Sequence, residues 1–200
     1  MAYIVVATRN QHKVDEYRAL INDDSVELTS LLDYPDCPEV EENGKTFAEN
    51  AALKAAAASK FCDSAAFADD SGLEVVALGG APGIYSARYA ETPEARIAKL
   101  LKAMENQTDR RARFVCNIAI AFNGEVIADF EGEVKGKIAM APRGEGGFGY
   151  DPVFIPDGYD MTMAELPAEE KNRISHRAVA FRKAAEFVAE QMSMFGDTAF

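Results

Sequence analysis

The sequence has little of what disulfide-linked, membrane-embedded or nucleic-acid-binding proteins need. Its three cysteines, Cys37, Cys62 and Cys116, follow no paired spacing, which suits reduced thiols in a cytosol. No apolar run approaches the length of a membrane span, and the first residues lack the basic region of a signal peptide. A net charge of -12 disfavours binding to a nucleic-acid backbone. We therefore expect a soluble, cytoplasmic protein that binds neither membrane nor nucleic acid.

Two familiar nucleotide-binding loops are absent as well. No G-x-x-x-x-G-K-[ST] segment occurs, which disfavours a P-loop NTPase. The first apolar run is not followed by G-x-G-x-x-G, and the match at 144–149 lacks a strand–turn–helix frame, which disfavours a dinucleotide-binding domain. The sequence has no internal repeat. Its 200 residues suit one domain, and a hydrophobic content of 48% is enough for a sizeable core.

The spacing of apolar residues predicts an α/β fold. A buried strand at 3–7 precedes a helix from about His12 to Asn22 and a second strand at 26–32. Long strands at 111–122 and 126–134 are joined by Asn123-Gly124, a strong hairpin signal. Antiparallel strands beside a parallel core imply a mixed sheet and two lobes. A short strand is expected at 153–155.

Three further helices are predicted. An alanine-rich helix at 47–61 follows a capping box formed by Thr46 and Glu49. Thr92-Pro93 starts a second helix that reaches about Asn106. The third runs to about Met192, and the tail after about Ser193 is expected to be frayed.

The stretch 67–73, Phe-Ala-Asp-Asp-Ser-Gly-Leu, contains the most informative pair of residues. An apolar run leads into Asp69 and Asp70, and Ser71-Gly72 follows at once, which predicts a buried strand that ends in two acids at a turn. A separate strand is then expected at 73–78. Two acids at a strand end are costly unless a cation or a group of donors offsets them. A magnesium site and a solvated exit in which Asp and Ser cap the turn both account for the pattern.

Other loops supply groups that suit a phosphate ligand. The turn after the first strand offers backbone amides and a helix N-terminus to an anion. Lys13 lies badly for the helix dipole, so either a ligand phosphate holds it or it is solvated. Glu42 lies close before the helix at 47–61, where it could act as a second acidic metal ligand. Asn50 and Lys54 share a face of that helix.

The C-terminal half supplies an aromatic residue and cations. Glycines surround Phe148, which either stacks on a nucleobase or anchors a flexible loop. Lys171, His176 and Arg177 add cationic donors, although a lone histidine is usually structural. Together with the acids, this inventory suits magnesium-assisted attack of water on a nucleotide.

The sequence resembles the inosine triphosphate pyrophosphatase family, also called the HAM1 family, over nearly its whole length. Six ordered motifs carry the resemblance: Thr8-x-Asn10-x-x-Lys13, Glu42-Asn-Gly-Lys-Thr-Phe-x-Glu-Asn50-Ala-x-x-Lys54-Ala, Ala68-Asp-Asp-Ser-Gly-Leu73, Gly79-Gly-Ala-Pro-Gly-Ile-Tyr-Ser-Ala-Arg-Tyr89, Gly147-Phe-Gly-Tyr-Asp-Pro152 and Ser175-His-Arg177. Arg9 departs from the family pattern, which commonly has glycine at this position. This difference affects what can be expected of the conformation of the first loop.

The resemblance implies an elongated mixed sheet flanked by helices, with the active site in the cleft between two lobes of a single domain at 1–200. It also implies a homodimer. The implied reaction is Mg²⁺-dependent hydrolysis of ITP, dITP, XTP or dXTP to the monophosphate and pyrophosphate, which cleanses the nucleotide pool. A Maf-type pyrophosphatase for other modified nucleotides and a catalytically silent nucleotide-binding sensor remain alternatives.

The resemblance also implies residue roles. Asp70 is implied as the proton acceptor and, with Glu42, as a metal ligand, while Asp69 is a further ligand or a support. The implied substrate-binding residues fall in two sets. The phosphate set is Thr8, Arg9, Asn10, Gln11, His12, Lys13 and Ser71, and the base set is Phe148, Gly149, Tyr150, Asp151, Lys171, His176 and Arg177.

Overall fold

The computed structural model describes residues 2–21 and 26–195. The chain forms two compact units. Unit 1 comprises Met1–Asp70, Cys116–Gly132 and Arg177–Phe200, and unit 2 comprises Ser71–Val115 and Glu133–His176. Each unit has its own hydrophobic clusters, one in unit 2 and two in unit 1 among the described residues.

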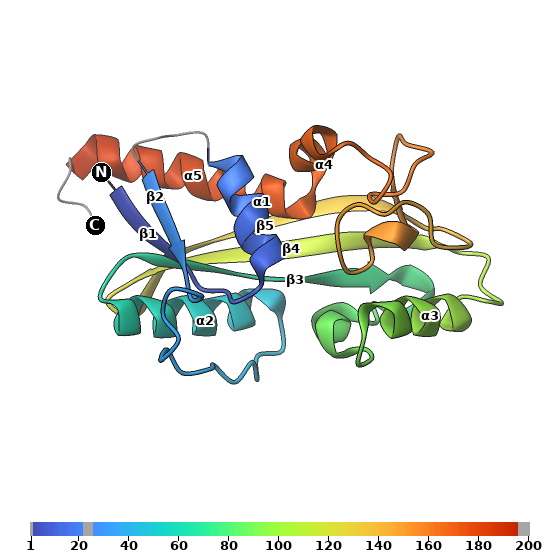
Figure 1. Cartoon of the computed structure of the whole chain (residues 1–200), viewed down its shortest axis with the longest axis horizontal. Coiled ribbons are helices and arrows are strands. Elements are labelled where there is room, and N and C mark those ends of the chain that lie inside the picture. The colour runs from blue at the N-terminus through green and yellow to red at the C-terminus, as the bar shows by residue number, and fades with distance from the viewer. Residues whose placement is uncertain (1, 22–25, 196–200) are drawn as a thin grey trace. The chain divides into compact units, whose positions relative to one another are not determined.

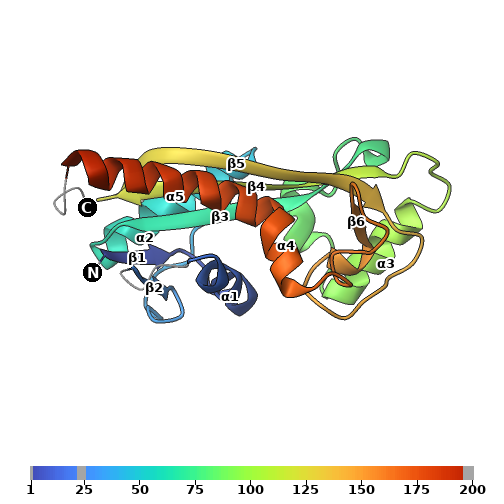
Figure 2. The same ribbon diagram turned by 90° about the horizontal axis from the view of Figure 1, so that it is seen from above.

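The strands form a mixed sheet, as predicted, and their order in it is β2-β1-β3-β4-β5-β6. Their bounds are β1 Ala2–Val6, β2 Val26–Ser30, β3 Ala66–Val75, β4 Arg111–Phe122, β5 Glu125–Ile138 and β6 Phe154–Pro156. β1 pairs in parallel with both β2 and β3, whereas β5 and β6 are antiparallel. Figures 1 and 2 both show β1 and β2 side by side. The predicted hairpin between β4 and β5 is confirmed, because Asn123 and Gly124 have φ values of 51° and 84°, as a type I′ turn requires.

Strand β3 differs from the prediction. It runs without interruption from Ala66 to Val75, so the turn expected at Ser71-Gly72 is wrong. The strand expected at 73–78 is the second half of β3, followed by a 3-10 turn at Val76–Leu78. Successive side chains on a strand point to opposite faces, so Asp69 and Asp70 are separated without any turn.

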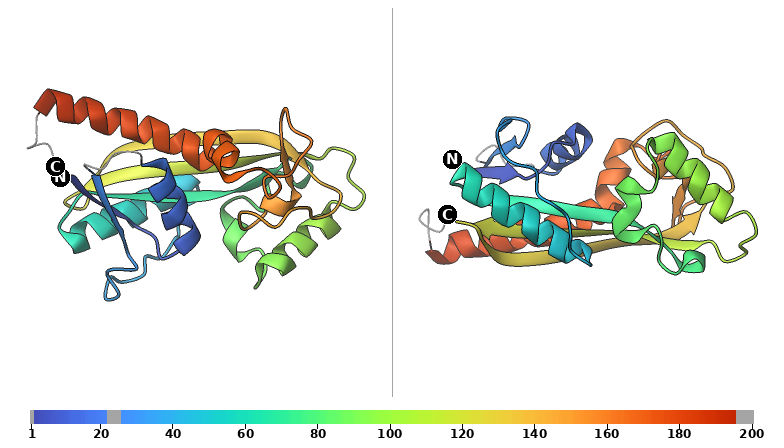
Figure 3. Two further views of the ribbon diagram at one scale, coloured as in Figure 1. Left: turned by 45° about the horizontal axis from the view of Figure 1, so that its top comes forward. Right: turned by 90° about the horizontal axis from the view of Figure 1, so that it is seen from below.

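Helices cover both faces of the unit 1 strands (Figure 1). Helix α2, Phe47–Cys62, packs its buried alanines on the face that contains Ala66 and Ala68. Helices α1, Gln11–Leu20, and α5, His176–Phe195, pack on the opposite face around Phe67. Seen from below, α2 lies along β3 (Figure 3, right). The even-numbered residues of β3 in unit 1 therefore face α2, and the odd-numbered ones face α1 and α5.

The predicted helix starts are confirmed. Thr46 caps α2 by accepting a hydrogen bond from the backbone N–H of Glu49 at 3.1 Å. The Glu49 carboxylate accepts from the backbone N–H of Lys45 at 2.6 Å, one residue before the usual capping-box donor. Thr92 caps α3, Pro93–Ala103, which ends three residues earlier than expected. In α1 the helix ends at Leu20, and the expected end at Asn22 lies outside the described residues.

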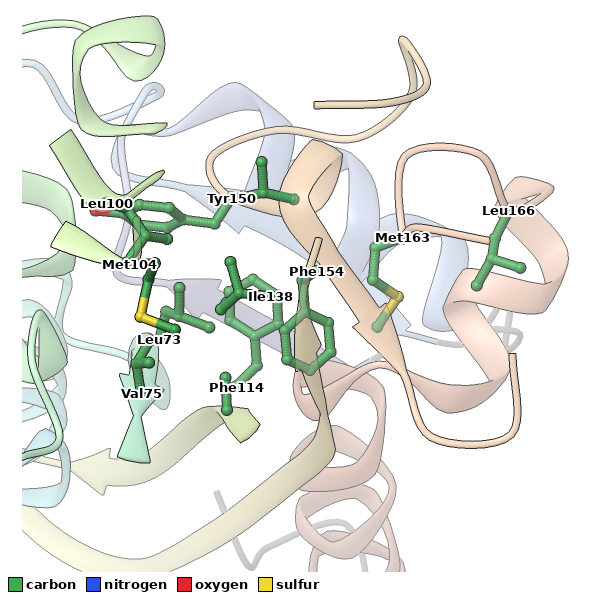
Figure 4. Packing of buried hydrophobic residues seen from close by; sticks show 12 residues of the cluster. Leu73, Val75, Leu100, Met104, Phe114, Ile138, Tyr150, Phe154, Met163 and Leu166 are labelled. Atoms are coloured by element: carbon green, nitrogen blue, oxygen red, sulfur yellow. The ribbon is translucent and has the colours of Figure 1, made fainter. Parts of the chain in front are cut away.

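The core of unit 2 gathers side chains from β3, β4, β5 and β6 and from α3 (Figure 4). Phe114 and Phe154 lie 4.6 Å apart between ring centroids, with Ile138 beside them in Figure 4. Leu100 of α3 and Met104, which follows the helix directly, are fully buried. Helix α4, Ala168–Ile174, completes the unit.

Two expectations concern the ends of the chain and membranes. The predicted frayed tail falls mainly on 196–200, outside the described residues, and α5 extends to Phe195. Within the described ranges, no helix combines the length and apolar character that crossing a membrane requires.

Candidate active site

The first loop of the candidate site lies at the carboxyl end of β1, where ligands bind in parallel sheets. Thr8 Oγ1 accepts a hydrogen bond from the backbone N–H of Asn10 at 3.1 Å. Asn10 Oδ1 in turn accepts from the backbone N–H of His12 at 3.0 Å, which caps α1. Thr8 therefore shapes the loop, and Asn10 caps the N-terminus of α1.

The two long polar side chains of this loop are turned to local partners. Arg9 donates to the backbone carbonyl of Cys37, which ties the loop to the segment before α2. Gln11 Nε2 donates to Asp15 Oδ1 at 2.7 Å, one turn along α1. His12 is exposed. Within the described contacts, these side chains organise the loop and the first turn of the helix.

Asp69 faces α1 and the start of α5. Its Oδ2 lies 2.9 Å from Lys13 Nζ and 3.3 Å from Arg177 Nη2, while only 2% of the residue is exposed. Burial alone would raise the pKa of this carboxyl group, but Lys13 and Arg177 outweigh it and hold the pKa well below its usual value. Lys13 is thus paired with a protein carboxylate and is largely shielded from solvent.

Asp70 faces α2 and has different neighbours. Its carboxylate accepts from Asn50 Nδ2 and Lys54 Nζ, each at 3.2 Å. The same Lys54 ammonium lies 2.9 Å from Glu42 Oε1. Burial raises the pKa of Asp70, and the opposing effects of Lys54 and Asn50 do not cancel it. A carboxylate whose pKa is raised in this way is better suited to accept a proton.

The two adjacent acids are therefore pushed apart in pKa by their surroundings. Such a divergence is typical of sites in which two carboxylates have different tasks. Asp69 is a permanently charged group inside a buried ion cluster, whereas Asp70 is half-buried next to Glu42. The sequence cannot reveal this difference, because both residues follow the same apolar run.

A metal centre is not preassembled: among residues 2–21 and 26–195, no three His, Cys, Asp or Glu side chains group closely enough to hold an ion. Glu42 and Asp70 nevertheless share one ammonium group, so a single cation already lies against both carboxylates. Carboxylate oxygens are the ligands that Mg²⁺ prefers, and it usually keeps several waters beside one or two of them. The two residues fit such an ion.

Unit 2 carries a second cluster of the predicted residues. Asp151 Oδ2 accepts from Lys171 Nζ at 2.7 Å and from the backbone N–H of Phe148 at 2.9 Å. Lys171 Nζ also lies 5.1 Å from the centroid of the Phe148 ring. A cavity of about 480 Å³ opens beside Phe148, between the glycine-rich loop and α3. The buried ion pair thus fixes an aromatic residue at the edge of a cavity.

Other predicted residues of unit 2 have partners outside this cluster or are placed only by the backbone. The Tyr150 hydroxyl donates to the backbone carbonyl of Ser86 at 2.9 Å, and the ring is buried. His176 stacks on Phe114 with ring centroids 4.8 Å apart. Ser71 lies on β3, and Gly149 has a φ of 64°. These contacts hold Tyr150 and His176 in the core of the unit.

The structure separates two neighbours that the sequence places together. His176 belongs to unit 2, whereas Arg177 joins Asp69 in unit 1. Unit 1 also holds residues absent from the predicted set, namely Glu16, Asn50 and Lys54. The shared helix face of Asn50 and Lys54 was an available signal for those two. Glu16 is the partner of Arg177 across 161 positions, and no local pattern reports such a contact.

The fold and this site define an α/β protein with an acidic, lysine-containing site formed by the loop after β1, the middle of β3 and residues of α1 and α2. The Ham1 family model matches residues 4–187. The chain belongs to the Ham1 family.

Relatives and solved structures are similar over most of their length. A dITP/XTP pyrophosphatase of Geobacillus kaustophilus is 54% identical over 191 residues, covering 93% of this chain and 94% of the relative. A dITP/XTP pyrophosphatase of Bacillus licheniformis is 48% identical over 188 residues, covering 92% and 96%. A HAM1 protein from Coxiella burnetii has a similar structure, with a TM-score of 0.86, 40% identity and coverage of 95% and 100%.

Proposed function

We propose that this chain hydrolyses non-standard purine nucleoside triphosphates, dITP and XTP above all, to the monophosphate and pyrophosphate. The two relatives described above are named for this activity. They are 54% and 48% identical to this chain over nearly its whole length. The observation that carries the proposal is that the two adjacent acids have different surroundings and opposite pKa shifts. Asp69 is buried in a cluster of charged groups, and Asp70 lies beside Glu42. We extend the proposal to a single domain over 1–200 that works as a cytoplasmic homodimer.

The phosphate chemistry is assigned to unit 1. Glu42 and Asp70 would hold Mg²⁺, which when bound neutralises phosphate charge and lowers the pKa of a coordinated water. Asp70 accepts the proton of the attacking water. The water oxygen forms a bond to the α-phosphorus, the bond to the bridging oxygen breaks, and pyrophosphate leaves. Asn50 and Lys54 keep the Asp70 carboxylate oriented during this step.

Lys13 and the first loop are assigned to phosphate binding. Thr8 and Asn10 hold the N-terminus of α1 in a position that favours an anion. When substrate binds, Lys13 leaves Asp69 and pairs with a phosphate oxygen. Arg177 remains paired with Asp69 and continues to neutralise it. Ser71, the next residue after Asp70 on β3, is assigned to the same task.

Recognition of the base is assigned to unit 2. Phe148 stacks on the purine, and Lys171 and Asp151 read its edge while their mutual ion pair keeps them in register. A protein donor that hydrogen-bonds a 6-oxo group finds no acceptor at this position in adenine, which carries a 6-amino group. A buried donor without a partner disfavours binding strongly, so ATP should be rejected.

The proposal is tested by product analysis. Purified protein and Mg²⁺ are incubated separately with ITP, XTP, dGTP, ATP, dUTP and methylated pyrimidine triphosphates. We expect pyrophosphate and monophosphate from ITP and XTP, little from the others, and loss of turnover when the metal is chelated.

Each rival activity has its own outcome in that assay. A preference for modified pyrimidines would identify a Maf-type pyrophosphatase, and binding of ITP without turnover would identify a sensor. Orthophosphate as the first product would rule out attack at the α-phosphorus. Titration with Mg²⁺, Mn²⁺ and Ca²⁺ tests which ion supports the reaction.

A further inference from the structure

One buried amide of α2 connects the two acids that are assigned to the metal. Asn50 is fully buried. Its Oδ1 accepts a hydrogen bond from the backbone N–H of Gly44 at 2.9 Å, and its Nδ2 donates to Asp70 Oδ2 at 3.2 Å. Gly44 lies two residues after Glu42, so the same side chain holds the segment that carries one acid and the carboxylate of the other.

The two partners of Asn50 account for the type of side chain between them. A backbone N–H can only donate and an ionised carboxylate can only accept, so the residue between them must offer one acceptor and one donor. An aspartate would bring a second negative charge to Asp70, and an alanine would leave both partners unsatisfied. Gly44 matches this arrangement, because a Cβ at its position would lie 2.6 Å from Asn50 Oδ1.

The hydrogen bond from Asn50 makes the two oxygens of Asp70 different. Oδ2 accepts from Asn50, whereas Oδ1 accepts from Lys54 Nζ at 3.2 Å. The same ammonium group lies 2.9 Å from Glu42 Oε1. The oxygen of Asp70 that shares a cation with Glu42 is therefore Oδ1. A metal ion that takes the place of this ammonium group would meet Asp70 through one oxygen.

We infer that Asn50 makes the candidate metal site selective for Mg²⁺ over Ca²⁺. Mg²⁺ requires nearly ideal octahedral geometry and is usually held by few carboxylates and several waters, whereas Ca²⁺ takes about six to eight oxygens and often binds both oxygens of one carboxylate. Because Asn50 engages Oδ2, Asp70 offers a single oxygen, which suits Mg²⁺. Asn50 is thus a positioning residue. The inference deepens the proposed function and rests on it for the assignment of the metal to Glu42 and Asp70.

The test measures metal binding directly, without nucleotide and without turnover. The protein is titrated with MgCl₂ and with CaCl₂, and the NMR chemical shifts of its backbone amides give a dissociation constant for each ion. Asn50→Ala removes the amide, and Asn50→Leu removes it while filling the space that a water molecule could occupy. In both variants Ca²⁺ can bind both oxygens of Asp70 without breaking a hydrogen bond. We expect the ratio of the Ca²⁺ constant to the Mg²⁺ constant to fall by about 10-fold, as for one hydrogen bond to a charged group.

Helix α2 supplies a matched control at its other end. Ser59 is also fully buried, and its Oγ accepts from the backbone N–H of Gly124 at 2.9 Å. Ser59→Ala removes an acceptor for a glycine N–H from the same helix, as Asn50→Ala does, but it contacts neither acid. This variant should keep the wild-type ratio within about twofold, because distant sites act independently. Thermal melting measures how much stability each variant loses.

Four outcomes would overturn the inference. An unchanged ratio in both Asn50 variants would limit the amide to a structural role, and an equal fall in Ser59→Ala would assign the effect to loss of helix stability. A wild-type protein that binds Ca²⁺ as tightly as Mg²⁺ would contradict the selectivity itself. Chemical shift changes that leave residues 42–44 and 70 unaffected would place the ion elsewhere. Failure of the wild-type protein to hydrolyse ITP would instead refute the proposed function, because the metal titrations do not depend on turnover.

Discussion

Each unit buries an aspartate against a lysine, at 2.9 Å for Asp69 and Lys13 in unit 1 and at 2.7 Å for Asp151 and Lys171 in unit 2. The two pairs differ in their third member. Asp69 also receives the guanidinium of Arg177, whereas Asp151 receives the backbone N–H of Phe148. A lysine that shares its carboxylate with a second cation can leave at lower cost. The unit 1 pair therefore suits exchange with an arriving anion, and the unit 2 pair suits a fixed frame around an aromatic ring.

The largest expected effect is that of Asp70→Asn, which removes the proposed proton acceptor but little stabilising charge. We expect kcat for ITP to fall by about 10²–10⁴-fold, the usual contribution of a general base. Because burial already disfavours the charged form of Asp70, the melting temperature should stay the same or rise. Steady-state kinetics and calorimetry measure both quantities. Wild-type turnover in this variant would remove Asp70 from its assigned role.

Asp69→Asn should instead lower stability. It leaves Lys13 and Arg177 without their shared carboxylate in a buried setting, and we expect the free energy of unfolding to fall by about 3 kcal/mol. Urea denaturation measures the loss, with Asp70→Asn as the matched control one residue away. If the two variants lose equal stability, the contrast between the two faces of β3 does not hold.

Gly147→Ala tests the fixed frame of unit 2. A Cβ at this position would lie 2.1 Å from Asp151 Oδ2 and 3.0 Å from Lys171 Nζ, so the ion pair must shift. We expect the KM for ITP to rise by about 10-fold, which corresponds to about 1.4 kcal/mol.

The control for this change is Gly158→Ala in the same unit. Gly158 also has a positive φ, of 86°, but a Cβ there would meet nothing within 4 Å. Both variants carry the same backbone cost of about 1 kcal/mol, so only Gly147→Ala should alter the KM. A matching rise in both KM values would assign the effect to backbone strain and not to the ion pair.

Much of the fold could be predicted from local patterns, and the failures have physical causes. The strands and helices with clear periodicity, such as Arg111–Phe122 and Phe47–Cys62, were found close to their bounds. Asp-Asp-Ser-Gly has the composition of a turn, and this misled the prediction for β3. The strand continues because each acid meets its own cations from another element, which lowers the cost of keeping both in extended backbone.

The sequence singled out candidate residues but not their groupings. Asp69, Asp70 and Glu42 were singled out by sequence, yet their different surroundings depend on Lys13 of α1 and Lys54 of α2, which only the fold brings to them. His176 and Arg177 are adjacent and were assigned one role. At the start of α5, the His176 side chain packs in unit 2 and the Arg177 side chain packs in unit 1. This difference depends on tertiary packing alone.

The alternation along β3 also limits how the sequence can change in length. Every role on this strand is fixed by whether a residue number is odd or even, and a shift of one residue moves each side chain to the other face. If Phe67 keeps its register, a single-residue insertion or deletion between Phe67 and Asp69 would exchange the surroundings of the two acids. If the acids keep theirs, the same change would instead turn the ring of Phe67 toward the alanines of α2. The spacing of this stretch is therefore as strong a constraint as the identity of its residues.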